Sequence, residues 1–359
     1  MNLYIHVPFC NGKCAYCAFY SEPRFSLPLW TAWSCRIEEE LERVSEPVAT
    51  LYLGGGTPTL APAGELEKFF RMLHRKLVFT ENSECSIECN PETVTLEKAA
   101  LLAEYFNRIS MGAQTFSAKL LKRIGRTASD PDVICSAFGE LRRATGCRIG
   151  LDLIYALPGQ TAEEFQADLQ TVAELGPDHL SAYTLTLEEG TPLAGQPGLS
   201  IPTDEVAAEQ WRMLEQFDPV RYPRYEVSNY AAAACECRHN QAVWHGEPYL
   251  GLGPSATSFD GVDRWTEVAD LHRWLNGEPA EVDRIPRENR LREIFVMGLR
   301  TVRGWSPGEF ETATGDSFDF LRPQLEKLAE DGLLDLSGGA IRPTAEGLLF
   351  WNDLALELI

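Results

Sequence analysis

Residues 6–21 read HVPFCNGKCAYCAFYS and place three cysteines, Cys10, Cys14 and Cys17, within eight positions, directly after a short apolar run. Residues 11–13 between them are loop formers, which argues against buried structural thiols. Structural zinc takes Cys or His in pairs with a longer spacer, and no second pair follows at a suitable distance. Ferredoxin-type clusters take four thiolates, so three would leave one iron with an open coordination position. The spacing therefore favours an iron-sulfur cluster that binds a further ligand.

Composition limits the other possibilities. The 359 residues exceed the usual size of one hydrophobic core, so we expect a large domain with a smaller one appended. The 53 acidic and 32 basic side chains give a net charge of −21, which argues against nucleic acid as a partner. The sequence has no apolar run of transmembrane length, and its start lacks the pattern of a signal peptide. We expect a cytoplasmic protein whose ten cysteines are ligands, free thiols or core residues rather than disulfides.

Strand-like and helix-like segments alternate over the first 190 residues. Six strand-like runs each precede a helical or loop segment: NLYIHV, ATLYLGGG, ECSIECNP, NRISMGAQT, RIGLDLIYALP and HLSAYTLTL. Nearly continuous apolar strands joined by helices predict an α/β fold with a parallel sheet covered by helices. Six units are fewer than the eight of a closed barrel, so we expect an open, partial (β/α)6 barrel.

The chain is expected to contain three parts. Residues 1–200 would form the partial barrel, because Gly and Pro cluster over 190–202. Residues 201–283 would be a linking extension that completes the site, with a helix at 204–217 followed by an irregular stretch. Residues 284–359 carry helical patterns and one short strand, which predict a small helical or winged-helix module.

The spacing C-x3-C-x2-C, with Tyr4 before it and Tyr16 inside it, resembles the cluster loop of the radical S-adenosylmethionine (SAM) enzymes. The resemblance implies that Cys10, Cys14 and Cys17 hold a 4Fe-4S cluster. It also implies that the amino and carboxylate groups of SAM chelate the open iron, and that reduction of the cluster cleaves SAM to a 5′-deoxyadenosyl radical. A reductant for the cluster is therefore an expected partner.

Polar residues at predicted strand ends extend this resemblance. The stretch LYLGGGTPT ends in three glycines that allow close backbone approach; the alternative is an ordinary strand-ending turn. By resemblance, Gly55, Gly56 and Thr57 would bind the amino end of SAM, and Arg126 would grip a carboxylate. The remaining SAM contacts implied by the resemblance are Tyr4, Tyr16, Glu88, Gln114, Asp152, Thr186 and Thr257.

The longer motifs indicate a branch of this superfamily. YIHVPFC, LGGGTPT, ECNPE, LIYALPGQT, YEVSNYA, RHN and YLGLGPSATS resemble the branch that contains oxygen-independent coproporphyrinogen oxidase and the HemW-type haem chaperones. GLRTVRGW and LAEDGLL resemble its closing domain. Phe19 occupies the place of a further cysteine in the oxidase, and Cys10 lies close to the first residue, whereas the oxidase has a long extension there. Both departures favour the chaperone side, so coproporphyrinogen oxidase activity is not expected.

A haem site follows from the same resemblance. The chaperones carry His-Asn-x-x-Tyr-Trp as a haem-binding signature, and this chain has His239, Asn240 and Trp244 but Val243 in place of the tyrosine. We expect His239 to bind haem iron, with Asn240 orienting its ring and Trp244 packing on the porphyrin. The alternative for His239 is a loop histidine hydrogen-bonded to a neighbour. Cys235 and Cys237 beside it are either helpers in metal or haem capture or free thiols in a flexible loop.

Two functions of different class follow. The first is a haem chaperone that binds haem and a 4Fe-4S cluster with SAM and delivers haem to an acceptor protein. The second is a radical SAM oxidoreductase acting on a porphyrin or a related organic substrate. Phe19 favours the first function, and Val243 weakens it.

Overall fold

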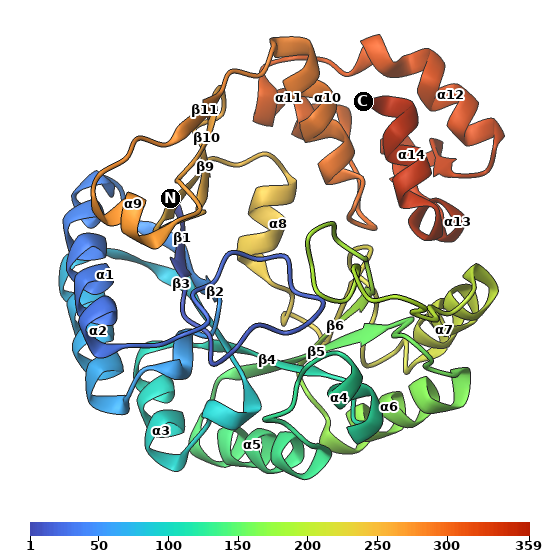
Figure 1. Cartoon of the computed structure of the whole chain (residues 1–359). Coiled ribbons are helices and arrows are strands. Elements are labelled where there is room, and N and C mark those ends of the chain that lie inside the picture. The colour runs from blue at the N-terminus through green and yellow to red at the C-terminus, as the bar shows by residue number, and fades with distance from the viewer.

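This computed structural model describes residues 1–359. It contains a sheet of eleven strands in the order β11-β10-β9-β8-β1-β2-β3-β4-β5-β6-β7. Strands β1 to β6 pair in parallel and in chain order. Strand β8 adds in parallel beside β1, and β7 adds antiparallel beside β6. Helices α1 to α6 follow the outer side of the resulting arc, which does not close (Figure 1). The predicted open partial barrel is confirmed.

The elements have the following bounds. The strands are β1 (Asn2–Val7), β2 (Val48–Gly55), β3 (Phe79–Cys89), β4 (Arg108–Gln114), β5 (Arg148–Tyr155), β6 (His179–Thr184), β7 (Asn229–Ala231), β8 (Tyr249–Leu252), β9 (Thr257–Phe259), β10 (Arg264–Thr266), β11 (Glu281–Asp283), β12 (Leu334–Asp335) and β13 (Arg342–Pro343). The helices are α1 (Leu27–Glu40), α2 (Ala63–Lys76), α3 (Leu96–Tyr105), α4 (Ala118–Arg123), α5 (Pro131–Ala144), α6 (Ala162–Leu175), α7 (Asp204–Gln216), α8 (Arg238–Trp244), α9 (Leu271–Leu275), α10 (Arg287–Gly298), α11 (Pro307–Thr314), α12 (Arg322–Glu330), α13 (Ala345–Leu349) and α14 (Trp351–Leu358).

Residue alternation in the strands separates an apolar layer from a polar interior. In β1, Leu3, Ile5 and Val7 are fully buried members of the main hydrophobic core. Asn2, Tyr4 and His6 alternate with them and so point to the opposite face of the sheet. The apolar layer is covered by the outer helices, so chemistry-bearing side chains gather on the concave face. Helix α8 lies on that concave side (Figure 1).

Local sequence signals fix the helix ends on the outer layer. Helix α6 begins with a capping box, in which Thr161 accepts from Glu164 N and the Glu164 side chain accepts from Thr161 N. It ends at Gly176, which has a left-handed conformation with φ of 62°. This helix has the bounds that its sequence pattern predicts.

The prediction of an irregular stretch after α7 is wrong. Residues 218–283 contain strands β7 to β11 and helices α8 and α9, and the strands extend the sheet at both ends. These strands have three or four residues each, which is too short for a periodic hydrophobic pattern. They form because the edges of β1 and β6 offer unpaired backbone groups.

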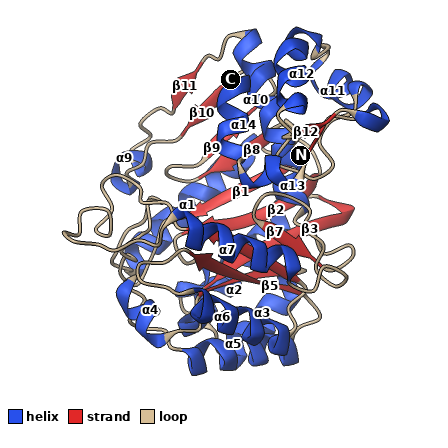
Figure 2. Ribbon diagram, turned by 90° about the vertical axis from the view of Figure 1, so that its right-hand side faces the viewer, coloured by secondary structure: helices blue, strands red, loops and turns tan.

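The C-terminal region is helical with a small two-stranded sheet, β12 paired with β13 (Figure 2). Its apolar side chains, together with Phe259 of β9, form a separate core of 16 residues that includes Trp305, Phe310 and Leu354. These features agree with the predicted winged-helix-like module, whereas the three-part division of the chain stays a prediction. None of the helices combines the length and the apolar composition needed to cross a lipid bilayer.

Candidate functional site

The cysteine loop follows β1 and runs across the concave side of the sheet (Figure 1). Two distant parts of the chain and the far end of the loop itself hold its backbone. Cys10 N donates to Glu22 O at 3.0 Å, Ala15 N donates to Ile124 O at 3.0 Å, and Leu193 N donates to Ala15 O at 2.8 Å. The loop is therefore positioned by the segments after β4 and β6 as well as by its own residues.

The three thiols have an environment that suits a cluster. Cys10, Cys14 and Cys17 are all half-buried and free. Burial raises the pKa of the Cys14 and Cys17 thiols, opposed by Arg126 at Cys14 and by a backbone hydrogen bond with Phe19 at Cys17. No three potential ligand side chains converge on one point that would hold a single ion. In a 4Fe-4S cluster each thiolate binds its own iron, so separated sulfurs fit a cluster.

The three glycines after β2 allow close packing of the cysteine loop. Gly56 N donates to Val7 O at 2.8 Å, and Thr57 N donates to Phe9 O at 2.7 Å. A Cβ on Gly56 would lie 2.6 Å from Phe9 O, and one on Gly55, whose φ is +109°, would lie 2.5 Å from the His6 ring. The strand end thus needs glycine because its own chain is so close. The SAM contacts of Gly55, Gly56 and Thr57 stay a prediction that would use carbonyl oxygens, since their N–H groups are already bonded.

Arg126 and Thr57 are joined at this edge by Asn90, which sequence analysis missed. Asn90 Nδ2 donates to Thr57 Oγ1 at 2.9 Å, and the Thr57 hydroxyl donates to Cys10 Sγ at 3.7 Å. Arg126 donates to Asn90 Oδ1 at 3.2 Å and to Gly112 O at 2.8 Å, and it pairs with Glu92 at 3.7 Å. Its Nε is buried without a partner. Arg126 thus lies beside the cysteine loop with its terminal nitrogens bonded within the protein, and its contact with the carboxylate of SAM stays a prediction.

Two carboxyl groups on the concave face lie next to this network. Glu88 accepts from the Tyr52 hydroxyl at 2.9 Å and from Gly55 N at 3.1 Å, and Asp152 accepts from Ser110 Oγ at 3.0 Å. Burial, followed by the charge of Asp152, raises the pKa of Glu88 to about 7. Burial also raises the pKa of Asp152. Glu88 can therefore hold or release a proton near neutral pH.

Of the two tyrosines of the motif, Tyr4 lies on β1 before the cysteine loop and Tyr16 lies within the loop. Tyr4 is hydrogen-bonded to His6 Nδ1 at 3.0 Å, and His6 Nε2 to Tyr20 O at 3.0 Å. Burial lowers the pKa of His6 to about 4, so the imidazole is neutral at pH 7. Burial raises the pKa of Tyr16, as does the adjacent Cys14, while Arg126 opposes the shift. His6 is a second residue that sequence analysis missed, although its alternation with Tyr4 was visible.

Gln114 belongs to the same edge, but two other predicted residues are set apart from it. Gln114 ends β4 with φ of 68°, at an irregularity in the pairing with β5. Such strain is common at functional sites. Thr186 is exposed and lies two residues beyond β6. The Thr257 hydroxyl is hydrogen-bonded to Thr266 on β10 at 3.0 Å. Neither threonine is hydrogen-bonded to the cysteine-loop network.

His239 is buried on α8 rather than placed in a loop, with 5% of its surface exposed. Its Nδ1 is hydrogen-bonded to Thr50 Oγ1 at 2.8 Å. Thr50 donates to Asn2 Oδ1 at 2.9 Å, and the Asn2 amide donates to Glu247 and Pro248. Since the Thr50 proton is used for Asn2, His239 must donate from Nδ1, which leaves the Nε2 lone pair free. Burial lowers the pKa of His239 to about 4, so the ring is neutral.

The neighbours of His239 differ from those expected. Thr50, not Asn240, orients the ring. Trp244 packs with Tyr225 and Arg300, so the expected stacking on porphyrin is not supported by its position. Val243 is one helical turn from His239 and shares its face. Cys237 is fully buried and donates its thiol to Glu84, so it is not a flexible-loop thiol.

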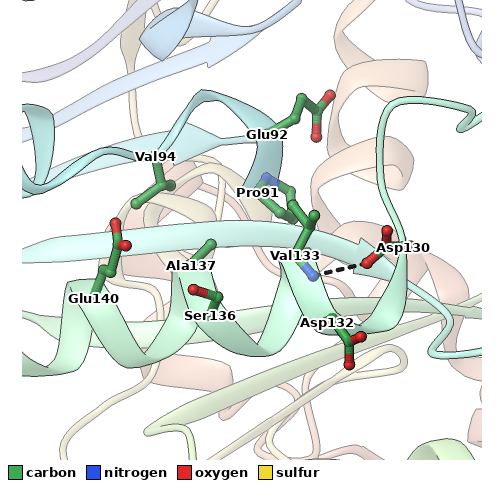
Figure 3. A pocket seen from close by; sticks show the side chains of 9 residues that line it. All are labelled: Pro91, Glu92, Val94, Asp130, Asp132, Val133, Ser136, Ala137 and Glu140. Carbon is green, nitrogen blue, oxygen red and sulfur yellow. Dashed lines mark hydrogen bonds between the residues drawn. The ribbon is translucent and has the colours of Figure 1, made fainter.

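A hollow of the surface lies elsewhere, between residues 91–94 and helix α5 (Figure 3). Its volume is about 370 Å³, and its lining includes Glu92, Asp130, Asp132 and Glu140. Asp130 caps α5 through Val133 N at 2.9 Å, and Glu92 is already bonded to Ser129. None of the predicted site residues lines this hollow.

Comparison with known proteins agrees with this geometry. The family model of the radical SAM superfamily matches residues 4–172, and that of the HemN C-terminal domain matches residues 285–350. The heme chaperone HemW of Bacillus subtilis is 32% identical, over 98% of this chain and 97% of that protein. HemW of Escherichia coli is 31% identical, over 100% of this chain and 97% of that protein.

The chain belongs to the HemW family of radical SAM proteins. Its fold is also similar to that of coproporphyrinogen III oxidase (HemN) from Escherichia coli, described as a radical SAM enzyme. That match has a TM-score of 0.84 at 25% identity and covers 99% of this chain and 89% of the oxidase. The predicted membership of this branch is confirmed, and so are the 4Fe-4S cluster and SAM as cofactors of the family.

The Gly56→Ala variant tests the close approach of the cysteine loop to β2. Because the added Cβ would meet backbone oxygens of Phe9 and Val7, the free energy of unfolding should fall by roughly 1–3 kcal/mol. Iron incorporation on anaerobic reconstitution should fall as well, since the loop is displaced. Urea unfolding and iron analysis would measure both effects. Gly64→Ala in α2, where a Cβ meets nothing within 4 Å, is the matched control and should lose neither.

Glu88→Gln tests the buried carboxyl through the pH dependence of stability in the cluster-free protein. Folded Glu88 keeps its proton up to about pH 7, whereas the unfolded chain releases it near about pH 4.3. The folded state therefore binds more protons between these values, so this group makes the unfolding free energy decrease as pH rises through the window. Urea unfolding at several pH values should show a smaller decrease for the variant. Parallel curves for the two proteins would contradict the raised pKa.

Proposed function

We propose that this protein is a haem chaperone, which binds haem and carries a 4Fe-4S cluster with SAM in support of haem delivery to an acceptor protein. The observation that carries the proposal is full-length relatedness at 32% identity to the heme chaperone HemW of Bacillus subtilis. We place its action in the cytoplasm, where thiolate ligands stay reduced. A reductant for the cluster and an acceptor protein for haem are its expected partners.

In this proposal Cys10, Cys14 and Cys17 hold the cluster. When bound, the cluster and SAM supply reductive cleavage of a sulfonium bond at the open iron. Around that position we expect Arg126 to supply the positive charge for the carboxylate of SAM, and Asn90 keeps Arg126 and Thr57 in place. Glu88 and Asp152 extend the polar surface along the concave face.

We propose that haem iron binds Nε2 of His239. The hydrogen bond from Nδ1 to Thr50 fixes the ring, and Nε2 has no hydrogen-bond partner. Nε2 is also not fully buried, so it borders open space. A neutral imidazole held through its other nitrogen is the usual arrangement for a metal ligand. One helical turn from His239, Val243 stands where the family motif has a tyrosine, so the phenol group is missing there.

The second candidate is a radical SAM oxidoreductase acting on a porphyrin. The similarity to coproporphyrinogen III oxidase, together with a carboxyl group of pKa about 7 in the interior, favours it. The two candidates differ in 5′-deoxyadenosine, which an oxidoreductase forms in proportion to its organic substrate. Anaerobic assays with coproporphyrinogen, reductant and SAM should give no protoporphyrinogen if the chaperone proposal holds.

Alanine at Cys10, Cys14 or Cys17 should abolish the cluster. The wild-type protein, reconstituted anaerobically with iron and sulfide, should gain about four irons per chain and a spectrum that changes when SAM is added. Each Ala variant should lose the charge-transfer absorbance and most of the iron. Cys235→Ser, at a half-buried thiol outside the loop, is the control and should keep both. Stoichiometric zinc without iron in the wild type would contradict the cluster assignment.

His239→Ala should shift the Soret band and weaken haem binding by roughly 10- to 100-fold or more, with cluster content unchanged. Thr50→Val removes the partner of Nδ1 and should weaken binding by roughly 10-fold. Val243→Tyr should strengthen binding, because residue 243 shares the face of His239. His74→Ala, on the exposed surface of α2, is the control.

Haem titrations followed by absorption spectroscopy measure these changes. A wild-type Soret spectrum in His239→Ala would show that His239 is not the ligand. A wild-type protein that binds no haem would contradict the chaperone proposal itself.

A further inference from the structure

Arg108 is a buried cation without a partner in the protein. It is the first residue of β4 and is 2% exposed. It takes part in no hydrogen bond or ion pair of its side chain, and its Nε is buried and unpartnered. The terminal nitrogens of its guanidinium also lack a partner but are not fully buried, so they border open space. The other buried arginine, Arg126, has three partners in the protein.

No carboxylate forms an ion pair with Arg108. Among carboxylates, Glu84 raises the pKa of Arg108 most strongly, but Glu84 is fully buried and engaged by other groups. Arg148 pairs with Glu84 at 3.5 Å, and the backbone N–H groups of Arg238 and His239 each donate to it at 3.2 Å. Glu88 and Asp152 also lie within electrostatic range of Arg108, but neither forms an ion pair with it, and burial raises the pKa of both carboxyl groups. Tyr52 and Cys237 are neutral at pH 7 because burial raises their pKa values.

Two further polar side chains around Arg108 each have a buried atom without a hydrogen-bond partner. Ser86 is its register neighbour on β3, is 1% exposed and has an unpartnered hydroxyl. His179 Nε2 is hydrogen-bonded to the Tyr225 hydroxyl at 2.8 Å, and that hydroxyl also accepts from Cys237 N at 3.2 Å. His179 Nδ1, in contrast, is buried without a partner. Ser86 and His179 therefore each bring an unpartnered polar atom to the surroundings of Arg108.

We propose that Arg108 binds a carboxylate group of a ligand that enters the concave interior of the barrel. A guanidinium presents a planar fork that pairs with both oxygens of a carboxylate, and such pairing offsets the cost of burying the charge. Ser86 and His179, each with an unpartnered polar atom, would add hydrogen-bonding groups to this site.

Two ligands of the proposed function bring a carboxylate, haem through its propionates and SAM through its amino-acid end. The inference rests on the proposed function for the identity of the ligand, not for the existence of the site. The geometry favours haem, because the ring of Tyr52 lies 5.3 Å from that of His239, and Tyr52 is in register with Ser86, which is in register with Arg108. Arg126, beside the cysteine loop, is the residue expected to pair with the carboxylate of SAM.

The test compares the wild-type protein with Arg108→Gln and with the matched control Arg148→Gln. Arg148 is the register neighbour of Arg108 on β5, but its charge is paired with Glu84. Each protein is titrated with haem, with haem dimethyl ester, whose propionates are neutral, and with SAM after cluster reconstitution. The melting temperature of each protein is measured without ligand.

Arg108→Gln should bind haem roughly 10- to 100-fold more weakly and lose the preference for haem over its dimethyl ester. Its melting temperature without ligand should rise, because an uncompensated buried charge is removed. Arg148→Gln should keep the preference for haem and melt at a lower temperature, because Glu84 is left unpaired. Arg108→Lys, which keeps the charge without the fork, should keep part of the preference.

Each other outcome is decisive. Weaker binding of SAM alone in Arg108→Gln would assign the carboxylate to SAM and overturn the haem assignment. Unchanged affinity for both ligands together with a lower melting temperature would show that Arg108 is structural and overturn the site. If the wild type binds no haem, the proposed function fails, and the SAM titration with the melting temperatures alone decides whether Arg108 is an anion site. If Arg108→Gln fails to fold, Arg108→Met provides the neutral variant, and failure of both variants to fold would show a structural role.

Discussion

The parallel pairing of β1 with β2 continues past the ends of both strands, and the site depends on this continuation. Gly56 and Thr57 donate to Val7 and Phe9 at 2.8 and 2.7 Å, directly before the first cysteine. The approach is so close that side chains on Gly55 and Gly56 would overlap the loop. The cysteine loop is therefore held by backbone geometry, which side-chain motion does not disturb.

The concave face of the sheet also carries ionisable side chains at separate places. Its carboxyl groups lie at Glu88 and Asp152 near the cysteine loop, and its unpaired cation lies at Arg108, toward the starts of the strands. Carboxyl groups at one place and a guanidinium at another on the same interior surface give a charged ligand a preferred orientation. Helix α8 closes the same interior and is anchored by Glu84, which accepts from two of its backbone N–H groups.

Local patterns made much of the fold and the cluster predictable. The cysteine spacing lies within eight residues, the strands of the barrel alternate or are continuously apolar, and helix α6 carries its own cap signals. Strands β7 to β11 escaped prediction because they are too short to show a period and form only against existing strand edges.

The interior of the site was less accessible to sequence reasoning. Thr50 orients His239 from 189 residues away, and Asn90 joins Thr57 to Arg126 across strands. Arg108 opens an apolar run as an ordinary polar strand end would, and only the fold shows that it is buried without a partner. Such pairings arise from strand register, which a single sequence does not encode locally.

Mössbauer spectroscopy of protein reconstituted with iron-57 tests the central claim most directly, because it distinguishes irons by their ligands. With three cysteine ligands for a four-iron cluster, one iron in four should change its isomer shift and quadrupole splitting when SAM is added, while the other three keep theirs. Four irons that are equivalent and insensitive to SAM would contradict the assignment of Cys10, Cys14 and Cys17 to a cluster with one open iron.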